Sequence, residues 1–512
     1  MSTLVAEGVD TCFMNPGTSE MHFVAALDHV PAMHGVLALF EGVATGAADG
    51  YARVAGRPAA ALVHLGPGLA NGLANLHNAR RAHSPVVAVV GDHALSHQRY
   101  DAPLQSDIAS LARPMSGWLR ASTHSEHLAD DVVEAVRAAN GPPGQVATLV
   151  VPADLSWSEA PAPAPHGTAG TPTAATVAEA AVTNAATALR SGRGALLVGG
   201  RATGPAGLRA ASRVAEATGA KLLCETFPAN LHRGAGLPPV ERLGYLAEFA
   251  EAQLQGMEHL MLVDAAVPVS FFAYPGRRSL LAPEGCAVHQ LAAGPDDVVG
   301  ALEALAESLG APARGVRAQP ASRPALPSGA LDARSAAAVI GALLPEGAVV
   351  SDEANTSGVF VAGATAGCPP HQWLCLTGGA IGQGLPVATG AAVAAPGAKV
   401  LCLQADGSAM YTLQALWTQA RQELDVTTVV FNNGSYAVLE MELDRVGAQG
   451  SGARARDMLD LSRPDLDFVA LARGMGVAAS RATTAEELAD QVGRALADPG
   501  PAVVEAMVGR II

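Results

Sequence analysis

Short apolar runs alternate with segments of helical periodicity from one end of the chain to the other. Buried strands of a parallel sheet read as continuous apolar runs, whereas a helix that covers such a sheet repeats its apolar residues about every 3.6 positions. In the N-terminal third, this pattern predicts strands at Thr11–Met14, Gly35–Phe40, Ala60–Leu65 and Val86–Val90, with helices at Ser19–Leu27, Gly42–Val54 and Leu69–Ala82. Repeated β-α-β units of this kind predict a doubly wound parallel sheet.

The same alternation returns in the middle and in the C-terminal third of the chain. It predicts middle strands at Ala195–Val198, Lys221–Cys224, His259–Val263 and Ala287–Leu291, and C-terminal strands at Ala348–Ser351, Val400–Gln404 and Thr427–Phe431. We therefore expect an α/β fold of three doubly wound parallel-sheet domains. Ligands of such sheets bind beyond the carboxyl ends of the strands, so candidate chemistry is expected in those turns.

Two stretches rich in Pro, Gly, Ala and Ser interrupt the pattern, Ser158–Thr176 and Gly310–Ala330. Neither shows apolar periodicity, which is typical of linkers. They divide the chain into residues 1–157, 177–309 and 331–512. A chain of 512 residues is also long enough for about three domains of ordinary size.

Composition and charge narrow the classes of function. The net charge of −15 and the lack of a basic cluster argue against nucleic acid as a partner. The six cysteines are scattered without a metal-ligand spacing, which favours a reduced cytoplasmic protein. The apolar runs are shorter than the roughly 20 residues that a membrane span needs. A soluble cytoplasmic protein is therefore expected.

Oxygen-bearing side chains stand in two turns that follow neighbouring predicted strands. Asp406 follows one strand and Asn433 follows the next, 27 positions later. Because both turns lie at the carboxyl edge of one sheet, these two side chains can converge on a cation such as Mg²⁺. Gly407 lets the backbone approach a phosphate at the start of the following helix, expected over Tyr411–Leu424. Each turn alone would also be an ordinary helix cap or loop, so the joint spacing carries the interpretation.

This segment resembles the cofactor motif of enzymes that depend on thiamine diphosphate (ThDP), written G-D-G followed by about two dozen residues and N-N. The first Gly of the motif is Ala405 here. The resemblance implies that Mg²⁺ is held by Asp406, Asn433 and the carbonyl of Ser435, and that Gly407 and Ser408 contact the diphosphate. It extends over essentially the whole chain and points toward acetolactate synthase large subunits and benzoylformate decarboxylases.

The stretch from Phe40 to Arg53, FEGVATGAADGYAR, resembles the pyrimidine-binding domain of the same enzymes. By itself Glu41 would be an ordinary first-turn glutamate of a helix. In the resembling enzymes this glutamate exchanges a proton with the aminopyrimidine ring, which activates the thiazolium carbon. The resemblance therefore implies that Glu41 is catalytic.

Further cofactor contacts follow from the resemblance. In the Gly-rich turn after Thr377, Gly379 would accept a hydrogen bond from the cofactor amino group through its carbonyl, and Ile381 would be the bulky wedge that bends the cofactor. The other residues expected at the cofactor are Asn15, Pro16, Gly17, Asn71, Asn355 and Thr356.

Histidines at the carboxyl edge of the first predicted sheet help to distinguish carboligation from aldehyde release. Acetolactate synthases usually have Thr or Ser where His64 stands, whereas benzoylformate decarboxylases have a catalytic histidine there. Their second histidine, from the middle domain, is replaced by Phe271. His93 could take its place, while His97 reads as a solvated loop residue. A histidine is a suitable proton carrier for release of an aldehyde.

We therefore expect decarboxylation of a 2-keto acid with ThDP and Mg²⁺, followed by carboligation as in acetolactate synthase. The alternative is a benzoylformate decarboxylase-like enzyme that releases an aldehyde, and a regulatory subunit without turnover is less favoured. FAD is not expected, because the segment from Gly199 is a weak Gly-rich signal and no flavin loop is recognisable. A dimer or tetramer of identical subunits is expected by analogy.

Overall fold

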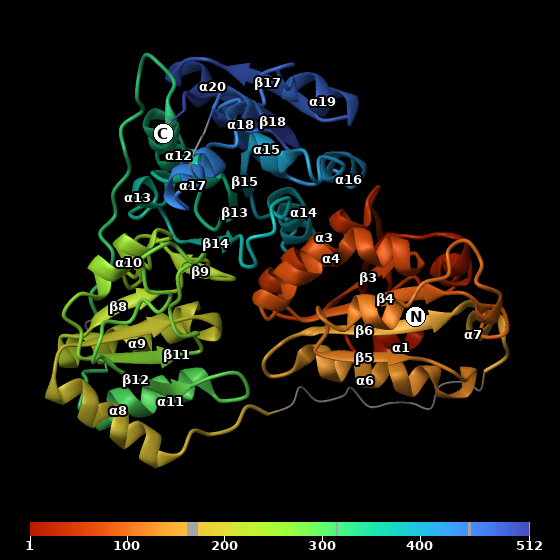
Figure 1. Cartoon of the computed structure of the whole chain (residues 1–512), viewed down its shortest axis with the longest axis horizontal. Coiled ribbons are helices and arrows are strands. Elements are labelled where there is room, and N and C mark those ends of the chain that lie inside the picture. Colours follow the sequence, from red (N-terminus) through yellow and green to blue (C-terminus); the bar gives the residue numbers. More distant parts are fainter. Residues whose placement is uncertain (161–172, 314–315, 449–451, 511–512) are drawn as a thin grey trace.

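The computed structural model describes residues 1–160, 173–313, 316–448 and 452–510. The chain forms three lobes, each built on a twisted, mainly parallel sheet with helices packed on its faces (Figure 1). The predicted fold class, three doubly wound α/β units, is confirmed.

The first lobe holds a six-stranded sheet in the order β2-β1-β3-β4-β6-β5, with every pair parallel. β3 and β4 are buried along their whole length, which explains their continuous apolar sequences. The strands are β1 Thr11–Asn15, β2 His34–Leu37, β3 Ala59–Val63, β4 Val86–Asp92, β5 Trp118–Ala121 and β6 Val146–Pro152. The helices are α1 Ser2–Ala6, α2 Met21–Ala25, α3 Glu41–Ala55, α4 Leu65–Arg81, α5 Ile108–Ala112, α6 Leu128–Asn140 and α7 Ala153–Trp157.

The middle lobe holds a five-stranded parallel sheet in the order β10-β8-β7-β11-β12. Its strands are β7 Gly194–Val198, β8 Lys221–Cys224, β10 Glu241–Arg242, β11 His259–Val263 and β12 Ala287–Ala292. Its helices are α8 Glu179–Ser191, α9 Pro205–Thr218, α10 Ala247–Leu254 and α11 Val298–Ser308.

The third lobe holds a seven-stranded sheet in the order β17-β18-β16-β15-β13-β14-β9, parallel except for the β14–β9 pair. Its strands are β9 Leu231–Arg233, β13 Val349–Glu353, β14 His371–Cys375, β15 Val400–Ala405, β16 Val426–Asn432, β17 Ala478–Ala482 and β18 Ala502–Met507. Its helices are α12 Ala333–Leu343, α13 Val361–Ala364, α14 Gly384–Ala394, α15 Asp406–Ala409, α16 Ala415–Arg421, α17 Ala437–Arg445, α18 Ala453–Asp457, α19 Phe468–Gly474 and α20 Ala485–Ala497.

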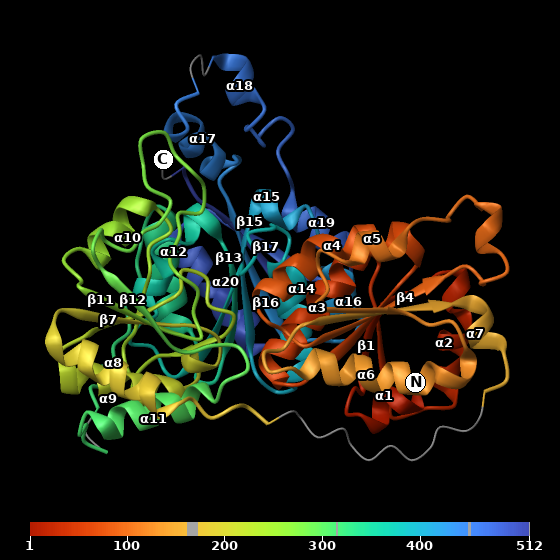
Figure 2. The same cartoon turned by 60° about the horizontal axis from the view of Figure 1, so that its bottom comes forward.

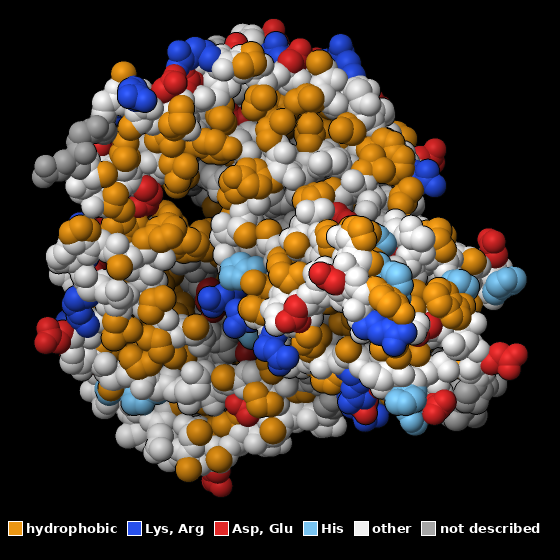
Figure 3. All heavy atoms as spheres, turned by 45° about the vertical axis from the view of Figure 1, so that its right-hand side comes forward, with side chains coloured by type: hydrophobic (Ala, Val, Ile, Leu, Met, Phe, Trp, Pro, Cys, Tyr) orange, Lys and Arg blue, Asp and Glu red, His pale blue; other side chains and the backbone are white. Residues whose placement is uncertain are grey.

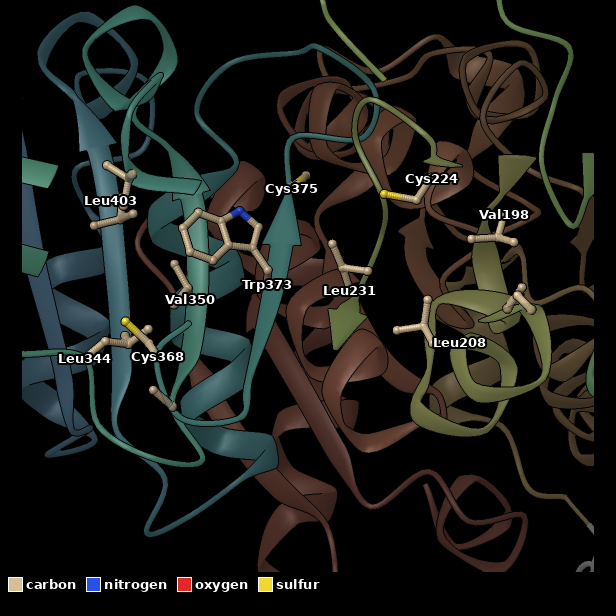
Figure 4. Packing of buried hydrophobic residues seen from close by; sticks show 14 of the residues in the cluster. Val198, Leu208, Cys224, Leu231, Leu344, Val350, Cys368, Trp373, Cys375 and Leu403 are labelled. Carbon is tan, nitrogen blue, oxygen red and sulfur yellow. The ribbon is translucent and has the colours of Figure 1, made fainter. Parts of the chain in front are cut away.

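One strand of the third sheet comes from the middle part of the sequence. β9 pairs antiparallel with β14, so that Leu231 lies opposite the fully buried Trp373. Through Leu231, one hydrophobic core continues from the third sheet to the middle sheet, where it includes Val198 and Leu208 (Figure 4). This core is shared by the segments on both sides of residues 310–330. The domain boundary predicted there therefore stays a prediction.

Helices α3 and α14 join the first lobe to the third by unusually close packing (Figures 1 and 2). A Cβ atom on Gly390 would lie 1.8 Å from the Ala47 carbonyl oxygen, and one on Gly50 would lie 2.2 Å from the Val387 carbonyl oxygen. Small residues are therefore required where the helices cross. This explains the Gly- and Ala-rich sequences of both helices.

Two predicted helices differ from the structure. The expected helix Tyr411–Leu424 is wrong in its first part, because the chain forms a short α15 and then turns before α16 begins at Ala415. The Thr412 hydroxyl donates to the Gly382 carbonyl at 2.9 Å, a tertiary contact that holds this turn. The expected helix Ser19–Leu27 is divided into α2 and two flanking 3-10 turns.

The two predicted linkers lie at the junctions between the lobes. Residues 161–172 of the first linker lie outside the described residues. The described part of the second linker, Gly310–Ala330, contains no helix or strand. It is nevertheless packed, since Arg323 donates to the carbonyls of Ala342 and Leu344 at the end of α12, each at 2.8 Å. No helix in the described ranges is both long and apolar enough to span a membrane.

Candidate functional site

Asp406 and Asn433 come together at the carboxyl edge of the third sheet. Asp406 is the first residue of α15 and is buried. One of its carboxylate oxygens accepts from the backbone N–H groups of Asn433 (3.0 Å) and Gly434 (2.8 Å), and the other accepts from the Gly407 N–H (2.8 Å). The two turns predicted from the sequence are thus fixed to one another. Burial raises the pKa of Asp406, and a nearby cation would favour its charged form.

The remaining oxygen atoms of this turn are of the kind that binds a hard cation. Asn433 Oδ1 accepts from the Ser435 N–H at 2.9 Å, which orients the carboxamide. In the described ranges no hydrogen bond reaches the Ser435 carbonyl. Those ranges also contain no group of three or more His, Cys, Asp or Glu residues suited to a metal ion. A carboxylate, a carboxamide oxygen and a free carbonyl are the kind of oxygen ligands that Mg²⁺ accepts.

The predicted diphosphate contacts surround the same turn. Asn355 Nδ2 donates to Ser408 Oγ at 2.9 Å. Asn355 is exposed and has a φ of +49°, a conformation that Asn adopts more readily than most residues. Gly407 is required sterically, because a Cβ atom there would lie 2.4 Å from the Tyr436 ring. Thr356 is half-buried in the same turn. Polar side chains and the Tyr436 ring therefore lie against this turn.

The turn at Gly379 offers an unused backbone acceptor. Gly379 has a φ of +74°, which glycine adopts without strain. The carbonyls of Gly378 and Ala380 are engaged by side chains of α4, at 3.0 and 2.8 Å. The Gly379 carbonyl lies between these two carbonyls in the chain. Among the described residues, no donor forms a hydrogen bond with it. Ile381 is partly buried two residues later. The acceptor that the sequence predicts for the cofactor is therefore available.

Glu353 is a residue of this region that sequence reasoning missed. Its carboxylate, buried at the end of β13, accepts from the N–H groups of Gly382 (2.7 Å) and Gly384 (2.6 Å) and from the Gln404 amide (3.0 Å). Burial raises the pKa of Glu353. The carboxylate thereby fixes the turn that carries Gly379. Its place after a predicted strand is the signal that could have identified it.

Glu41 is the first residue of α3, and three residues separate it from the last residue of β2. The expectation that it directly follows a strand is therefore wrong by three positions, because Phe40 serves as the helix N-cap. Glu41 is 8% exposed, and its Oε2 accepts from Asn71 Nδ2 at 3.0 Å. Gly68 lies so close that a Cβ atom there would be 2.9 Å from Glu41 Oε1. Two predicted site residues, Glu41 and Asn71, are thus brought into contact.

His64 is held by a second buried carboxylate. His64 Nδ1 lies 2.8 Å from Glu20 Oε2, which also accepts from the Gly17 N–H at 2.7 Å. Glu20 is 3% exposed, and burial raises its pKa. Sequence reasoning placed Gly17 at the site but missed Glu20, which stands three residues later. The spacing of this capping turn was the available signal.

The other predicted residues of the first lobe lie at the same edge. Asn15 ends β1 and donates to the Ala38 carbonyl at 2.8 Å, with Pro16 directly after it. His93 follows β4, and its Nε2 is buried without a hydrogen-bond partner. His97 is exposed, with its ring 5.4 Å from that of His93. An unpartnered buried nitrogen is unusual in a folded protein.

The middle lobe contributes Phe271, which stands in place of the expected second histidine. A Cβ atom on Gly379 would lie 2.6 Å from Phe271 Cζ, so the ring covers the turn described above. The Gly-rich segment from Gly199 lies elsewhere in this lobe. There the carboxylates of Glu225 and Asp264 fill the space beside the turn, 2.6 and 2.4 Å from the ideal Cβ positions of Gly199 and Gly200.

Comparison with known proteins identifies the family. The pattern that defines the N-terminal TPP-binding domain of thiamine pyrophosphate enzymes matches residues 1–112, and the C-terminal TPP-binding domain matches residues 357–506. Thiamine pyrophosphate is another name for ThDP. The chain belongs to the thiamine pyrophosphate enzyme family.

Two curated relatives cover almost the whole chain. A Mycobacterium tuberculosis protein, provisionally named an acetolactate synthase large subunit, is 58% identical over 514 residues, which is 100% of this chain and 98% of the relative. Benzoylformate decarboxylase of Pseudomonas aeruginosa is 30% identical, over 97% of this chain and 96% of its own. Both names are consistent with the two families that the sequence resembles.

A solved structure agrees with the fold. The ThDP-dependent 4-hydroxybenzoylformate decarboxylase of Rhodococcus jostii superimposes with a TM-score of 0.86 at 25% identity, covering 99% of this chain and 98% of that one. The three-lobed architecture is thus that of ThDP-dependent enzymes. The chain carries both the N-terminal and the C-terminal TPP-binding domain of the family.

Proposed function

We propose that this protein decarboxylates a 2-keto acid with ThDP and Mg²⁺ as cofactors. The observation that carries the proposal is Glu41, a buried carboxylate fixed by Asn71 in a chain that belongs to the ThDP family. Glu41 Oε1 takes part in no hydrogen bond among the described residues, so it is available to exchange a proton with a ring nitrogen. A protein that only binds the cofactor would not need this carboxylate.

The residues of the third lobe fit the cofactor. Asp406, Asn433 and the Ser435 carbonyl would hold the Mg²⁺ that bridges protein and diphosphate, and the Gly379 carbonyl would accept from the cofactor amino group. ThDP, when bound, would supply a nucleophilic carbon and accept the electron pair that stays behind when carbon dioxide leaves. The C1–C2 bond of the keto acid breaks, and the carboxylate carbon leaves as carbon dioxide.

The fate of the remaining carbon depends on His64. An aldehyde is released once this carbon takes up one proton. Glu20 holds Nδ1 of His64, which leaves Nε2 as the nitrogen that can carry a proton to a ligand. This pair favours release of an aldehyde. Carboligation, in which a second carbonyl compound takes the place of the proton, is the other candidate and is supported by the name of the relative with 58% identity.

The experiment is carbon dioxide release from a panel of 2-keto acids by protein loaded with ThDP and Mg²⁺, with analysis of the products. Glu41→Gln is the matched variant, because the amide keeps the shape and the bond to Asn71 but loses the exchangeable proton. We expect it to retain ThDP and to turn over about 10²–10⁴-fold more slowly. Absence of carbon dioxide release from every keto acid by loaded wild-type protein would overturn the proposal.

A further inference from the structure

Two histidines of the middle lobe face each other on neighbouring strands. His259 is the first residue of β11, and His289 lies in β12, which is the edge strand of the same sheet. His259 Nδ1 lies 3.1 Å from His289 Nε2. Helix α8 packs against both strands at the outer side of this lobe (Figure 1). The pair is separate from the candidate site, because His259 begins its strand and the candidate site lies beyond strand ends.

Ser191, the last residue of α8, determines which nitrogen of His259 carries a proton. The Ser191 hydroxyl donates to the Ala188 carbonyl at 3.0 Å and lies 3.2 Å from His259 Nε2. Because a hydroxyl has a single hydrogen, which here is directed to Ala188, Ser191 Oγ accepts from the Nε2–H of His259. Nδ1 of the neutral His259 ring therefore carries a lone pair, and this lone pair faces His289.

His289 can present a second lone pair to the same point. Its Nδ1 forms no hydrogen bond among the described residues, so the proton of the neutral ring can occupy either nitrogen. With that proton on Nδ1, two lone pairs face one another and a cation between them is favourable. Two imidazole nitrogens bound to one tetrahedral metal ion are about 3.3 Å apart. A small change in the orientation of the two rings would therefore allow both to bind one ion.

The surroundings of the pair favour binding of a metal ion from solvent. Burial and the neighbouring His259 lower the pKa of His289, so its ring is neutral at pH 7, and the neutral ring is the form that binds a metal. Both histidines are half-buried, so solvent reaches them. Glu258, the residue before His259, is already hydrogen-bonded to the backbone and side chain of Arg193. Water would fill the remaining ligand positions.

We propose that His259 and His289 form a binding site for one borderline divalent transition-metal ion such as Zn²⁺, Ni²⁺ or Cu²⁺. Imidazole suits these ions, and Cu²⁺ should bind most tightly of the three. Ser191 is a positioning residue, because its hydrogen bond to Nε2 directs Nδ1 toward the ion. A bound ion would link the edge strand β12 to β11. The site is independent of ThDP and of the proposed decarboxylation.

The first test measures metal binding to the holoenzyme by equilibrium dialysis, with ThDP and excess Mg²⁺ present to keep the candidate active site occupied. We expect the wild type to bind one equivalent of Zn²⁺ more than His289→Gln, and to bind Cu²⁺ at lower concentrations than Zn²⁺. Ser191→Ala keeps both ligands and should weaken binding about 10- to 100-fold. His127→Gln is the control. The rings of His124 and His127 lie 5.9 Å apart, but no hydrogen bond joins their nitrogens among the described residues.

The second test uses the wild-type protein, so it does not depend on the folding of a variant. Diethyl pyrocarbonate modifies accessible neutral imidazoles, and mass spectrometry locates the modified residues. Zn²⁺ should protect His259 and His289 from modification and should leave His127 unprotected. Hydrogen exchange of β12 should also become slower in Zn²⁺, because the ion links this edge strand to its neighbour.

Three results would contradict the proposal. Equal metal content in the wild type and His289→Gln, or modification of His289 in saturating Zn²⁺, would overturn the site. Equal protection of His127 would mean that ions bind adventitiously at any exposed histidine. Carbon dioxide release should be the same in the wild type and His289→Gln, and a joint loss of metal and activity would contradict the separation of this site from the candidate active site.

Discussion

Single glycines make room for the polar side chains of the candidate site. A Cβ atom on Gly17 would lie 2.2 Å from the His64 ring, and one on Gly91 would lie 1.6 Å from Glu20 Oε1. Substitution of either glycine would force the carboxylate or the imidazole to move. Close approach, and not only turn formation, is therefore a reason for glycine at these positions.

The pair formed by His64 and Glu20 leads to a prediction about product choice. If His64 delivers the proton that releases the aldehyde, His64→Ala should lower aldehyde formation by about 10²–10⁴-fold, the weight of one positioned acid or base. Proton exchange at the thiazolium carbon, followed by NMR in deuterated buffer, should fall much less. Glu20→Gln should act in the same direction with a smaller loss. Equal losses at both steps would show that His64 only shapes the pocket.

Asp406 leads to a prediction about the metal. Asp406→Ala should abolish tight retention of ThDP, because the variant loses the carboxylate that we assign to the bridging cation. Dialysis of the wild type against EDTA should remove activity until Mg²⁺ and ThDP are restored. Asp490→Ala, which removes an exposed carboxylate of α20, is the control. Unchanged ThDP affinity in Asp406→Ala would disprove the assignment.

At the scale of elements, the crossing of α3 and α14 fixes Glu41 relative to the turn that carries Gly379 in the same chain. α3 begins at Glu41, and α14 begins directly after the turn that carries Gly379. Buried Arg53 of α3 adds a polar contact, since it donates to the Cys375 carbonyl at 2.8 Å and pairs with Asp49. Any separation of the two helices would therefore move candidate site residues in both lobes.

Gly390 tests this crossing. Gly390→Ala should destabilise the protein by roughly 1–3 kcal/mol, because the added methyl group overlaps the α3 backbone. Gly474→Ala is the matched control in α19, where a Cβ atom would have no heavy atom within 4 Å. The control should be neutral or stabilising by up to about 1 kcal/mol. Thermal unfolding of both variants provides the measurement, and equal melting temperatures would contradict the role of the crossing.

Glu225 should make the stability of the middle lobe depend on pH. Burial raises the pKa of Glu225 from 4.5 to about 7. The folded state therefore binds more protons than the unfolded state between these values, and the contribution of this group to stability is lost as the pH rises through about 7. Glu225→Gln should gain stability relative to the wild type between pH 5 and pH 8, by at most about 3 kcal/mol. Parallel melting curves at both pH values would contradict this sign.

At the scale of the whole molecule, each of the three lobes contributes some of the candidate site residues. Glu41 and His64 lie in the first lobe, Asp406 and Asn433 in the third, and Phe271 in the middle lobe (Figure 1). In the upper half of Figure 3, hydrophobic side chains cover part of the third lobe beside a hollow, and charged side chains lie mostly along its rim. Such a surface is compatible with association between subunits.

At this scale we predict that identical subunits associate. In the enzymes that the sequence resembles, the glutamate of one subunit faces the diphosphate site of another. The active protein should therefore be at least a dimer, and specific activity should fall on dilution below its dissociation constant. Sedimentation and activity measured over the same concentrations provide the test. A fully active monomer at every concentration would contradict it.

Much of the fold was determined by the sequence alone. Continuous apolar strands such as β3 and β4 were identifiable because both faces of a parallel sheet are buried. The turns at Asp406 and Asn433 were identifiable because one β-α-β unit fixes both their spacing and their common edge. Such features depend only on residues close together in the sequence or on one β-α-β unit, so they can be predicted without a structure.

The tertiary structure alone decided contacts between residues far apart in the chain. Glu20 beside His64, Glu353 beneath the Gly379 turn, and Phe271 over it are separated by 44, by 26 and by 108 positions. None of these pairs follows from periodicity, because the order of the strands within a sheet brings together the first two pairs and the packing of the middle lobe on the third brings together the last. The interrupted helix after Asp406 has the same cause, since a hydrogen bond to a distant carbonyl prevails over a local propensity.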